Sequence, residues 1–430
     1  MKQNRRTFIK VMMKTAALAF LFAAVAAPLA AIDYGANLNS RTAFDGPVDF
    51  ADGNPVFRNT LSGFVRRNPV TRNETFGRVL LELSVTNTLS RTIDGDWASS
   101  TLVDLDTFRI DGFFPEWRNP EDLVRTSIGR FPIAEASGLV FSDRIDGASM
   151  SFDFPDYGLV FAGGFTGLIP GRATGVLMTF SDELDAGDAS TFGASSRLLG
   201  FAQATVPEAF ARQAVSAGVL AQTDLRQDFP SAEDEKLNSQ YIFATLGGPL
   251  TGDLYYSTAL ALSFQQRSFA DPLSPNGLSD PENSIGIGAQ LQAQYYLDPA
   301  GGSVITAMAR YGSAAGDTLG AFTPMTGPAV SLLNPISASD LSFFMLDYAL
   351  RPFAGQPGAR ARSLEVSAYS AVTAGANPFA DGSYQGVEAG SRVTYRPFSD
   401  LGARLWLGTF VPSETDDTRV YGRLELSASF

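Results

Sequence analysis

The side chains that could do chemistry in this chain are carboxylates and arginines, because histidine and cysteine are both absent. Their absence removes disulfides and both thiolate and imidazole metal ligands. It also removes every catalytic scheme that needs an imidazole base, including the Ser-His and Asp-His arrangements of hydrolases. The sequence therefore predicts neither an enzyme nor a bound cofactor.

Two runs of carboxylates could hold Ca²⁺ through oxygen ligands. They are Asp182-Glu183-Leu184-Asp185 and Glu233-Asp234-Glu235. Neither run has the spacing of a calcium-binding loop. We therefore expect no metal site here and interpret both runs as solvated acidic loops.

A second set of charged residues stands at positions that alternate with aliphatic ones, and alternate residues of a strand face opposite sides of a sheet. These charges would line a lumen that orients and selects solutes, or they would pair across strands and stiffen a wet wall. We give the two interpretations equal weight. The set is Arg78, Glu82, Arg109, Asp111, Arg125, Asp153, Glu365, Glu388, Arg392, Arg404, Arg423 and Glu425.

Segments of period two would position these charges. In the segment 284–298, Gln290, Gln292 and Gln294 lie opposite an aliphatic face, which suits water on one side and lipid on the other. We predict eighteen strands, of which the first two, the eighth and the ninth have the weakest pattern: 32–40, 59–66, 76–87, 100–112, 122–131, 144–154, 157–168, 196–206, 212–222, 239–247, 253–266, 284–298, 303–312, 341–351, 362–373, 384–396, 402–411 and 419–430.

The last of these segments ends the chain on an aromatic residue of the apolar face. Leu424, Leu426, Ala428 and Phe430 fall on that face, and Arg423 and Glu425 fall on the other. The segment resembles the closing strand of bacterial outer-membrane β-barrels of the porin type. The resemblance implies that these four apolar residues are an assembly signal recognised by the barrel assembly machinery.

The first 31 residues have the layout of a secretory signal. Five basic residues precede the apolar run 16–27, which is followed by Pro28 and small residues. We place the signal peptide at 1–31 and one barrel domain at 32–430. The stretch Asn4 to Lys10 also resembles a twin-arginine export motif, but a barrel with a lipid-facing exterior should not fold before export, so we favour an ordinary basic region.

Charge and hydropathy exclude two classes of protein. Removing the five bases of the signal from 32 Lys+Arg leaves 27, against 45 Asp+Glu, a net charge of −18. So acidic a chain is not expected to bind nucleic acid. No apolar run of 18 or more residues follows the signal, so no transmembrane helix is predicted there.

The connections between predicted strands sort by length. If both termini are periplasmic, the long connections 169–195, 223–238, 267–283 and 313–340 all lie outside, and short ones such as 155–156, 248–252, 299–302 and 397–400 lie inside. The sequence thus predicts a transmembrane antiparallel up-and-down β-barrel of about 18 strands, with 16 the next choice. Short periplasmic turns and long extracellular loops are part of that prediction.

The third external connection, 131–143, is far more apolar than its acidic neighbours. In general porins the third loop folds into the lumen and narrows it, and position in the strand order makes this segment the matching one. The alternative, which we favour slightly, is that the segment simply extends two strands beyond the membrane.

The fold and the resemblance favour a passive channel for small polar solutes or ions in the bacterial outer membrane. Its expected partners are the lipids of that membrane and further copies of the same chain in a homo-oligomer. One alternative is a fatty-acid-transporter-like barrel with residues 39–75 as an N-terminal plug and a hydrophobic solute. The other is a surface adhesin or structural barrel that conducts nothing. The external loops are acidic, which predicts weak cation selectivity.

Overall fold

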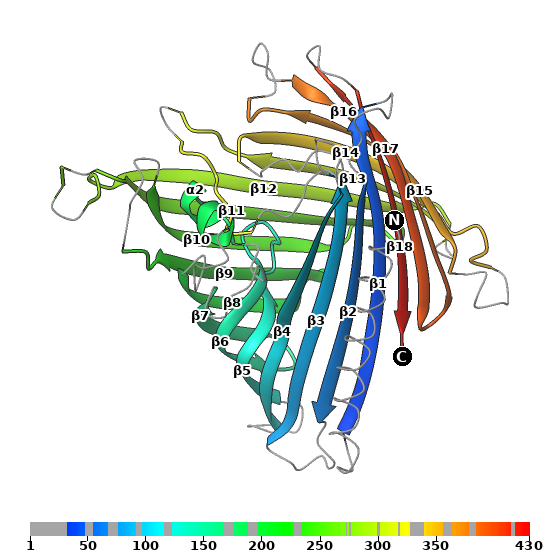
Figure 1. Cartoon of the computed structure of the whole chain (residues 1–430), viewed down its shortest axis with the longest axis horizontal. Helices are drawn as coiled ribbons and strands as arrows, with labels where there is room; N and C mark the ends of the chain where they lie inside the picture. The colour runs from blue at the N-terminus through cyan, green and yellow to red at the C-terminus, as the bar shows by residue number, and fades with distance from the viewer. Residues whose placement is uncertain are drawn as a thin grey trace.

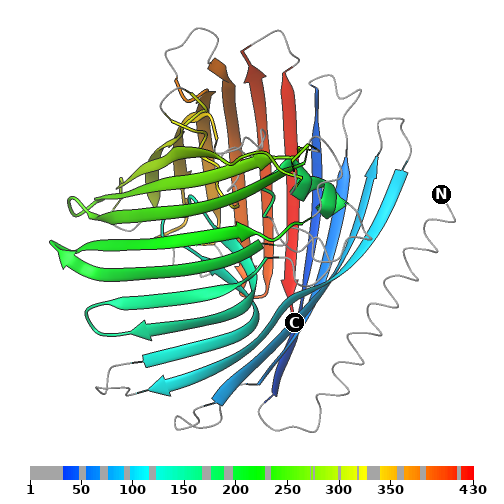
Figure 2. The same ribbon diagram turned by 90° about the vertical axis from the view of Figure 1, so that its left-hand side faces the viewer.

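The structure is one closed sheet of eighteen strands, every one antiparallel to its neighbours in sequence, with β1 and β18 pairing to complete the barrel (Figures 1 and 2). The computed structural model describes residues 32–47, 55–67, 76–91, 97–115, 123–166, 176–187, 197–227, 234–271, 273–274, 277–298, 302–316, 319–326, 339–355, 363–377, 384–413 and 418–430. No helix among these residues is long and apolar enough to cross a membrane. The predicted signal peptide, 1–31, lies outside the described residues.

The eighteen predicted strands are confirmed, including the four with the weakest pattern. Among the described residues, one short helix, α2 (Phe180–Gly187), accompanies them. The strands are β1 (Ile32–Pro47), β2 (Val56–Arg67), β3 (Phe76–Arg91), β4 (Trp97–Pro115), β5 (Leu123–Ala134), β6 (Ser142–Asp153), β7 (Gly158–Phe165), β8 (Arg197–Phe210), β9 (Gln213–Asp224), β10 (Glu235–Pro249), β11 (Leu254–Phe269), β12 (Glu282–Tyr296), β13 (Ser303–Gly312), β14 (Leu341–Leu350), β15 (Glu365–Ala374), β16 (Tyr384–Phe398), β17 (Leu401–Pro412) and β18 (Arg419–Ser429).

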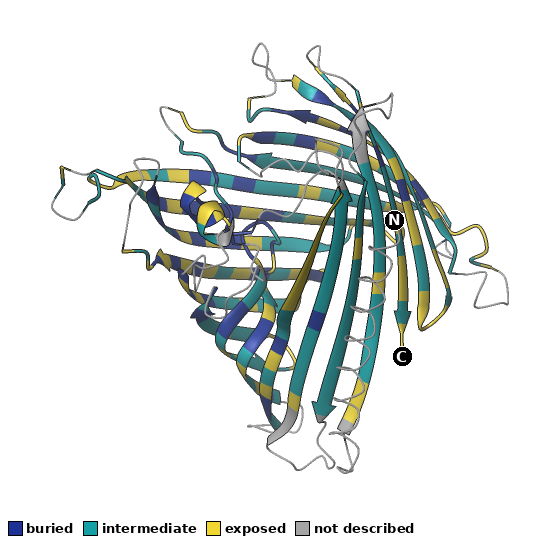
Figure 3. Ribbon diagram, in the orientation of Figure 1, coloured by how far each residue is buried: buried dark blue, intermediate teal, exposed yellow. Residues whose placement is uncertain are grey.

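Alternation of the side chains gives the wall two faces, as Figure 3 shows along the strands. On β11, Leu260 is 47% exposed and Ala261 is fully buried. Large apolar residues are exposed on the outer face, where a membrane barrel meets lipid, and the inner face carries small, polar and charged ones. The fold is therefore a transmembrane β-barrel, as predicted.

The connections differ on the two sides of the barrel. The longest ones, 166–196 and 313–340, lie on the side predicted to be external, and the two-residue turns 211–212 and 399–400 lie on the other. Ala211 and Arg212 have φ of 46° and 62°, as a tight turn between twisted antiparallel strands requires. One internal connection, 351–364, is longer than a short turn.

The N-terminal strands decide between two of the predicted functions. Residues 39–47 belong to β1, which pairs with both β18 and β2, and residues 56–67 form β2. Both segments lie in the wall. The alternative in which 39–75 forms a plug inside the barrel is therefore wrong for these residues.

Candidate channel constriction

The β5–β6 hairpin leaves the wall part-way along its length. β4 pairs with β5 only from Phe108 to Pro115, although β5 and β6 pair with each other as far as Ala134 and Ser142. Beyond the pair Phe108–Arg130, toward the external end of the barrel, β5 no longer pairs with β4. Residues 130–146, which we call the inner hairpin, therefore bend into the lumen.

Two glycines mark the bend. Gly129 has φ of +124°, and a Cβ added there would lie 2.0 Å from the carbonyl oxygen of Phe108. A Cβ on its cross-strand neighbour Gly147 would lie 2.0 Å from the carbonyl oxygen of Gly163. Side chains would clash with backbone at both places, so the close approach that starts the bend requires glycine.

The apolar side of the inner hairpin packs against the lumen face of the neighbouring strands β8 to β11. Phe131, Leu139 and Phe141 are buried in one cluster with lumen-facing residues of β8 to β11, among them Phe201 and Phe243. The preferred prediction for residues 131–143, two strands extended beyond the membrane, is thus wrong. The strands are extended, but they turn inward because their apolar side chains are buried there.

The tip of the inner hairpin is fixed by its own polar groups. The Glu135 carboxylate accepts hydrogen bonds from the backbone N–H of Ser137 and, at 2.9 Å, of Val140. The backbone N–H of Ala136 donates to Oε1 of Gln203, on β8, at 2.8 Å. These contacts satisfy backbone groups that the turn would otherwise leave buried without partners.

The external connection between β13 and β14 is hydrogen-bonded to the inner hairpin. Backbone N–H groups of Met325 and Thr326 donate to the carbonyl oxygen of Val140 at 2.9 and 3.1 Å. On its other side this segment, 319–326, is held by the wall, because Tyr241 donates to the carbonyl oxygen of Thr323 at 2.7 Å and Gln265 to that of Ala321 at 2.9 Å. Two external connections therefore narrow the lumen together.

The polar side of the inner hairpin faces β4. Arg130, 1% exposed, binds Asp146 through two hydrogen bonds, Nε to Oδ1 at 2.8 Å and Nη2 to Oδ2 at 3.0 Å. Its Nη1 donates to the carbonyl oxygen of Leu105, and Arg144 is 3.2 Å from Asp106. The Arg130–Asp146 pair joins the two strands of the hairpin, and the contacts with Leu105 and Asp106 hold the hairpin to β4.

A β-bulge on β4 increases the negative charge at this place. The register shifts where Glu82 pairs with Thr107 and Leu83 pairs with Leu105, so Asp106 is the extra residue. Asp106 and Asp104 then reach the two arginines of the inner hairpin. A bulge re-aims side chains in this way beside many functional sites.

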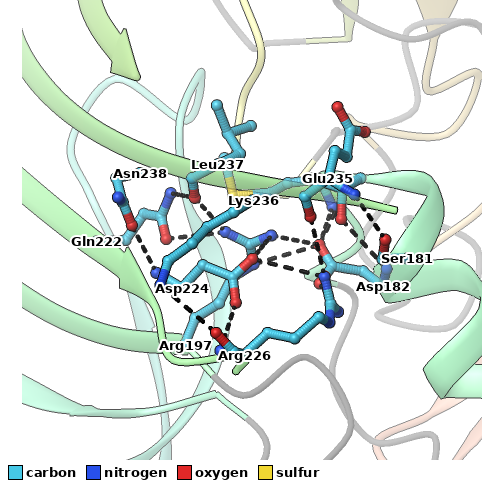
Figure 4. Close-up of polar contacts among 12 residues, drawn as sticks. Ser181, Asp182, Arg197, Gln222, Asp224, Arg226, Glu235, Lys236, Leu237 and Asn238 are labelled. Carbon is cyan, nitrogen blue, oxygen red and sulfur yellow. Dashed lines mark hydrogen bonds and ion pairs between the residues drawn. The ribbon is translucent and has the colours of Figure 1, made fainter. Parts of the chain in front are cut away.

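The external connection between β7 and β8 is tied to the wall by Arg197 and Arg226 (Figure 4). Arg197, fully buried at the start of β8, binds Asp182 of α2 at 2.7 Å and Asp224 at 3.2 Å. Arg226 binds the other oxygen of Asp182 at 3.1 Å and Asp185 at 2.8 Å. We call these five residues the arginine clamp. It joins α2 to the external ends of β8 and β9.

Arg226 of the arginine clamp stays protonated, because its pKa is raised. Burial lowers the pKa of Arg226, but the carboxylates of Asp224, Asp185 and Asp182 raise it by more, so the pKa lies above its usual value. Charge-assisted contacts on every side offset the cost of burying the guanidinium.

The predicted acidic loops are solvated only in part where the structure describes them, at the exposed Glu183 and the half-buried Asp185. Asp182, Asp234 and Glu235 are buried. Asp182 belongs to the arginine clamp, Asp234 accepts a hydrogen bond from Ser181, and Glu235 lies 3.2 Å from Arg267. That part of the prediction is wrong, because arginines distant in sequence reach these carboxylates. Glu233 lies outside the described residues.

Eight of the twelve predicted lumen charges form ion pairs with one another. The pairs are Arg109–Asp111 (2.8 Å), Arg125–Asp153 (2.7 Å), Arg392–Glu365 (3.3 Å) and Arg423–Glu425. Arg423 also lies over the Trp406 ring, 4.6 Å from its centroid. Arg125–Asp153 joins β5 to β6 and Arg392–Glu365 joins β16 to β15, as the second of the two interpretations requires, whereas the other two pairs each lie within one strand.

The other four predicted charges, Glu388, Arg404, Glu82 and Arg78, lie in four different surroundings. Glu388 is buried and accepts a hydrogen bond from Tyr369 at 2.6 Å. Arg404 is exposed and lies opposite Glu425, and Glu82 lies beside the bulge. Arg78 of β3 lies opposite Asp111 of β4, and the side chain of Arg78 is outside the described part.

Sequence patterns missed most of the charges at the constriction. They are Asp104, Asp106, Arg130, Arg144 and Asp146, with Arg197 and Asp224 in the arginine clamp. A signal was present for two of them, because continued alternation from Ile128 and Ala148 would have put Arg130 and Asp146 in lipid. A charge at such a position next to a glycine indicates that the strand leaves the wall.

Solved structures resemble this barrel over nearly its whole length. OccK9 (OpdG) of Pseudomonas aeruginosa aligns with a TM-score of 0.55 at 13% identity, covering 93% of this chain and 98% of that one. This is the porin fold. OccK2 (OpdF) of the same organism, also solved in complex with glucuronate, aligns with a TM-score of 0.54 at 15% identity over the same shares of the two chains.

The outer membrane protein OpdK of Pseudomonas aeruginosa shares the porin fold with this chain as well, with a TM-score of 0.53 at 12% identity over 93% of this chain and 99% of that one. No protein-family model and no curated protein matches the sequence. The likeness therefore lies in the fold, and the function must be argued from the lumen itself.

Proposed function

We propose that this protein is a passive channel of the bacterial outer membrane, through which small polar solutes or ions diffuse. The observation that supports it most is a closed wall of eighteen strands with charged residues on its inner face and two external connections folded into the lumen. Barrels of 16 to 18 strands leave an aqueous channel, whereas small ones are filled by side chains.

The constriction favours polar solutes. Arg144 is only partly buried, and Arg58 on β2 and Arg404 on β17 are exposed. Guanidinium groups that face water can orient a solute through hydrogen bonds and charge. OccK2, which shares the fold, binds glucuronate, a small polar solute of the class proposed here.

We propose no catalytic activity and no cofactor. The chain has no histidine or cysteine, and Asp146, Asp182, Glu388 and Asp234 are engaged by arginines, by Tyr369 or by serine. Among the described residues, no group of three or more carboxylates is placed to hold a metal ion.

Single-channel recording in a planar bilayer tests the channel directly. The refolded full-length protein should give discrete conductance steps, and vesicles containing it should swell in small sugars but not in large oligosaccharides. Detergent without protein, and protein that has not folded, serve as controls. Folded protein with no conductance and no swelling would contradict the proposal and favour a structural barrel or an adhesin.

A further inference from the structure

A row of small residues crosses the outer face of the wall on β6 to β9, and it continues onto β10 and β11. Cross-strand pairing links its six members, which are Ala148, Gly163, Gly200, Ala221, Gln240 and Phe264. Ile128, the partner of Ala148 on β5, is 63% exposed, and Phe264 lies on the same face of β11 as the exposed Leu260. The row therefore faces the membrane.

Larger side chains border this row on both sides. The next row toward the periplasm contains Phe161, Val219 and Ile242, all exposed, and the next one toward the outside contains Phe165 and Leu198. The hollow over the small residues has a volume of about 930 Å³, against 480 and 320 Å³ for two other hollows of the described outer face. We call this hollow the furrow.

The furrow slopes through the membrane because the strands are tilted. Phe264, at its upper end, is ten residues from the periplasmic start of β11 at Leu254, and Ala148, at its lower end, is five residues from the periplasmic end of β6 at Asp153. At about 3.4 Å a residue and a tilt of about 40°, this difference corresponds to about 13 Å of depth. One leaflet of the hydrocarbon core is about 15 Å thick. The furrow thus extends from the external boundary to near the middle of the membrane.

Polar amides stand at the upper end of the furrow. Gln240 belongs to the row itself, and Asn238, Gln266 and Asn283 follow one step nearer the external ends of β10 to β12. We call these four residues the amide shelf. Among the described residues, the side chains of Gln240, Gln266 and Asn283 form no hydrogen bond, and Asn238 accepts one from the backbone of β9 at 2.9 Å. A second hollow, of about 1010 Å³, lies over the amide shelf and is continuous with the furrow.

The amide shelf carries no formal charge, and the basic residues beside it have other contacts. Lys236 on β10 donates to the carbonyl oxygen of Arg226 at 3.4 Å, and Arg267 on β11 lies 3.2 Å from Glu235. A phosphate group is normally bound by arginine or lysine. Side-chain amides instead both donate and accept hydrogen bonds, and so match the hydroxyl groups of a sugar. The amide shelf therefore fits a sugar headgroup better than a phosphate.

We propose that the furrow and the amide shelf together bind one glycolipid of the outer leaflet, with an acyl chain in the furrow and the sugar on the shelf. The furrow is continuous with the lipid-facing wall, so lipid is what covers it. Its apolar part lies deep and its polar part at the boundary, in the same order as the chain and the headgroup of such a lipid. From Gln240 to Ala148 the furrow spans four strand spacings, about 19 Å, which suits one extended chain inclined across a leaflet. The site is independent of whether the lumen conducts.

Filling the furrow tests the binding of the chain. A Cβ added at Gly200 has no atom within 4 Å, so Gly200→Leu should fold like the wild type, judged by gel mobility without boiling. Gly63→Leu, at a lipid-facing glycine of β2 with the same open space, is the matched control. Native mass spectrometry of the refolded full-length protein, titrated with diglucosyl-diacylglycerol, should show one tightly bound molecule on the wild type and on Gly63→Leu, and at least tenfold weaker binding on Gly200→Leu. Equal binding to all three, or no tight binding to the wild type, would overturn the proposal.

The choice of headgroup tests the amide shelf. Phosphatidylglycerol with the same acyl chains should bind the wild type at least tenfold more weakly than the glycolipid does. The double variant Gln240→Leu with Gln266→Leu leaves the furrow open, so it should lose most of this preference. Asn59→Leu with Asn87→Leu, which changes two outer-face amides of β2 and β3, should keep it. Equal binding of the two lipids to the wild type, or an unchanged preference in the shelf variant, would refute recognition of the sugar.

Discussion

The buried ion pair between Arg130 and Asp146 should hold the inner hairpin in the lumen, and replacing Asp146 by alanine tests this. The change leaves the guanidinium of Arg130, 1% exposed, without the two hydrogen bonds of 2.8 and 3.0 Å that now neutralise it. Removing one partner of a buried pair costs about 3–5 kcal/mol. At 1.4 kcal/mol for each tenfold change, the fraction of hairpins released from the constriction should rise about 10²- to 4 × 10³-fold.

The same two strands supply a matched control. Arg125 and Asp153 also pair β5 with β6, at 2.7 Å, but their side chains are 51% and 45% exposed. An exposed pair contributes about 0–1 kcal/mol, so Asp153→Ala should leave the hairpin in place. The double change Arg130→Met with Asp146→Leu should restore it, because apolar residues of similar volume can replace a buried pair.

Two assays read the released hairpin while the wall stays folded. Brief proteinase K treatment of the native barrel should cut residues 135–141 in Asp146→Ala and spare them in the wild type, and single-channel recordings should show an added level of higher conductance. If Asp146→Ala is no more sensitive than Asp153→Ala, or if the double variant is equally sensitive, the ion pair does not hold the constriction.

Three further outcomes are expected. Gly147→Ala would place a Cβ 2.0 Å from the carbonyl oxygen of Gly163, so it should prevent the bend and raise the single-channel conductance. Gly200→Ala, which has open space around the new Cβ, is the control and should leave the conductance unchanged. A Gly147→Ala channel with wild-type conductance would contradict this. Phe430→Asp keeps the closing backbone bonds but charges the terminal aromatic position, so unfolded protein should accumulate in the periplasm; normal outer-membrane levels would show that the terminal strand is no assembly signal. Reversal potentials in a KCl gradient should show weak cation selectivity that fades as salt rises, since the Debye length is about 10 Å at 0.1 M; anion selectivity at high salt would contradict it.

The cation selectivity expected from the sequence depends only on those loop carboxylates that arginines do not neutralise. Asp182 and Asp185 are neutralised within the arginine clamp, and Glu235 by Arg267. Glu183, Asp280 and Glu282 are exposed and remain available to attract cations. The effect should therefore be weaker than the net charge of the loops suggests.

The wall of the barrel could be predicted from the sequence because alternation along each strand is a local property. Leu405 and Leu407, for example, are exposed on either side of the buried Trp406, as period two requires. Even β1 and β2, where the pattern is weak, form because β18 and β3 supply cross-strand partners. Closure of the sheet satisfies their backbone regardless of the side chains.

The constriction could be predicted only in part, because it depends on contacts between segments far apart in sequence. The apolar composition of 131–143 allowed for a loop in the lumen, but spacing gave no reason to prefer it. Likewise, nothing near Asp182 indicates that Arg197 and Arg226 neutralise it, since the register of β8 with β9 brings those arginines together. Side-chain pairing across a loop leaves no periodic trace in the sequence.

The pairing of β1 with β18 has a consequence for the order of folding. Ala36 and Phe430 exchange two backbone hydrogen bonds, of 3.1 and 2.8 Å, so the contact that completes the wall joins nearly the first and last described residues. For a flexible chain of this length, bringing those ends together costs about 5 kcal/mol of entropy, and every earlier partial sheet has two open edges. The seam should therefore close last. Until the seam closes, the unpaired edges of β1 and β18 could pair with other chains, so the factor that binds the final strand must also cover these edges.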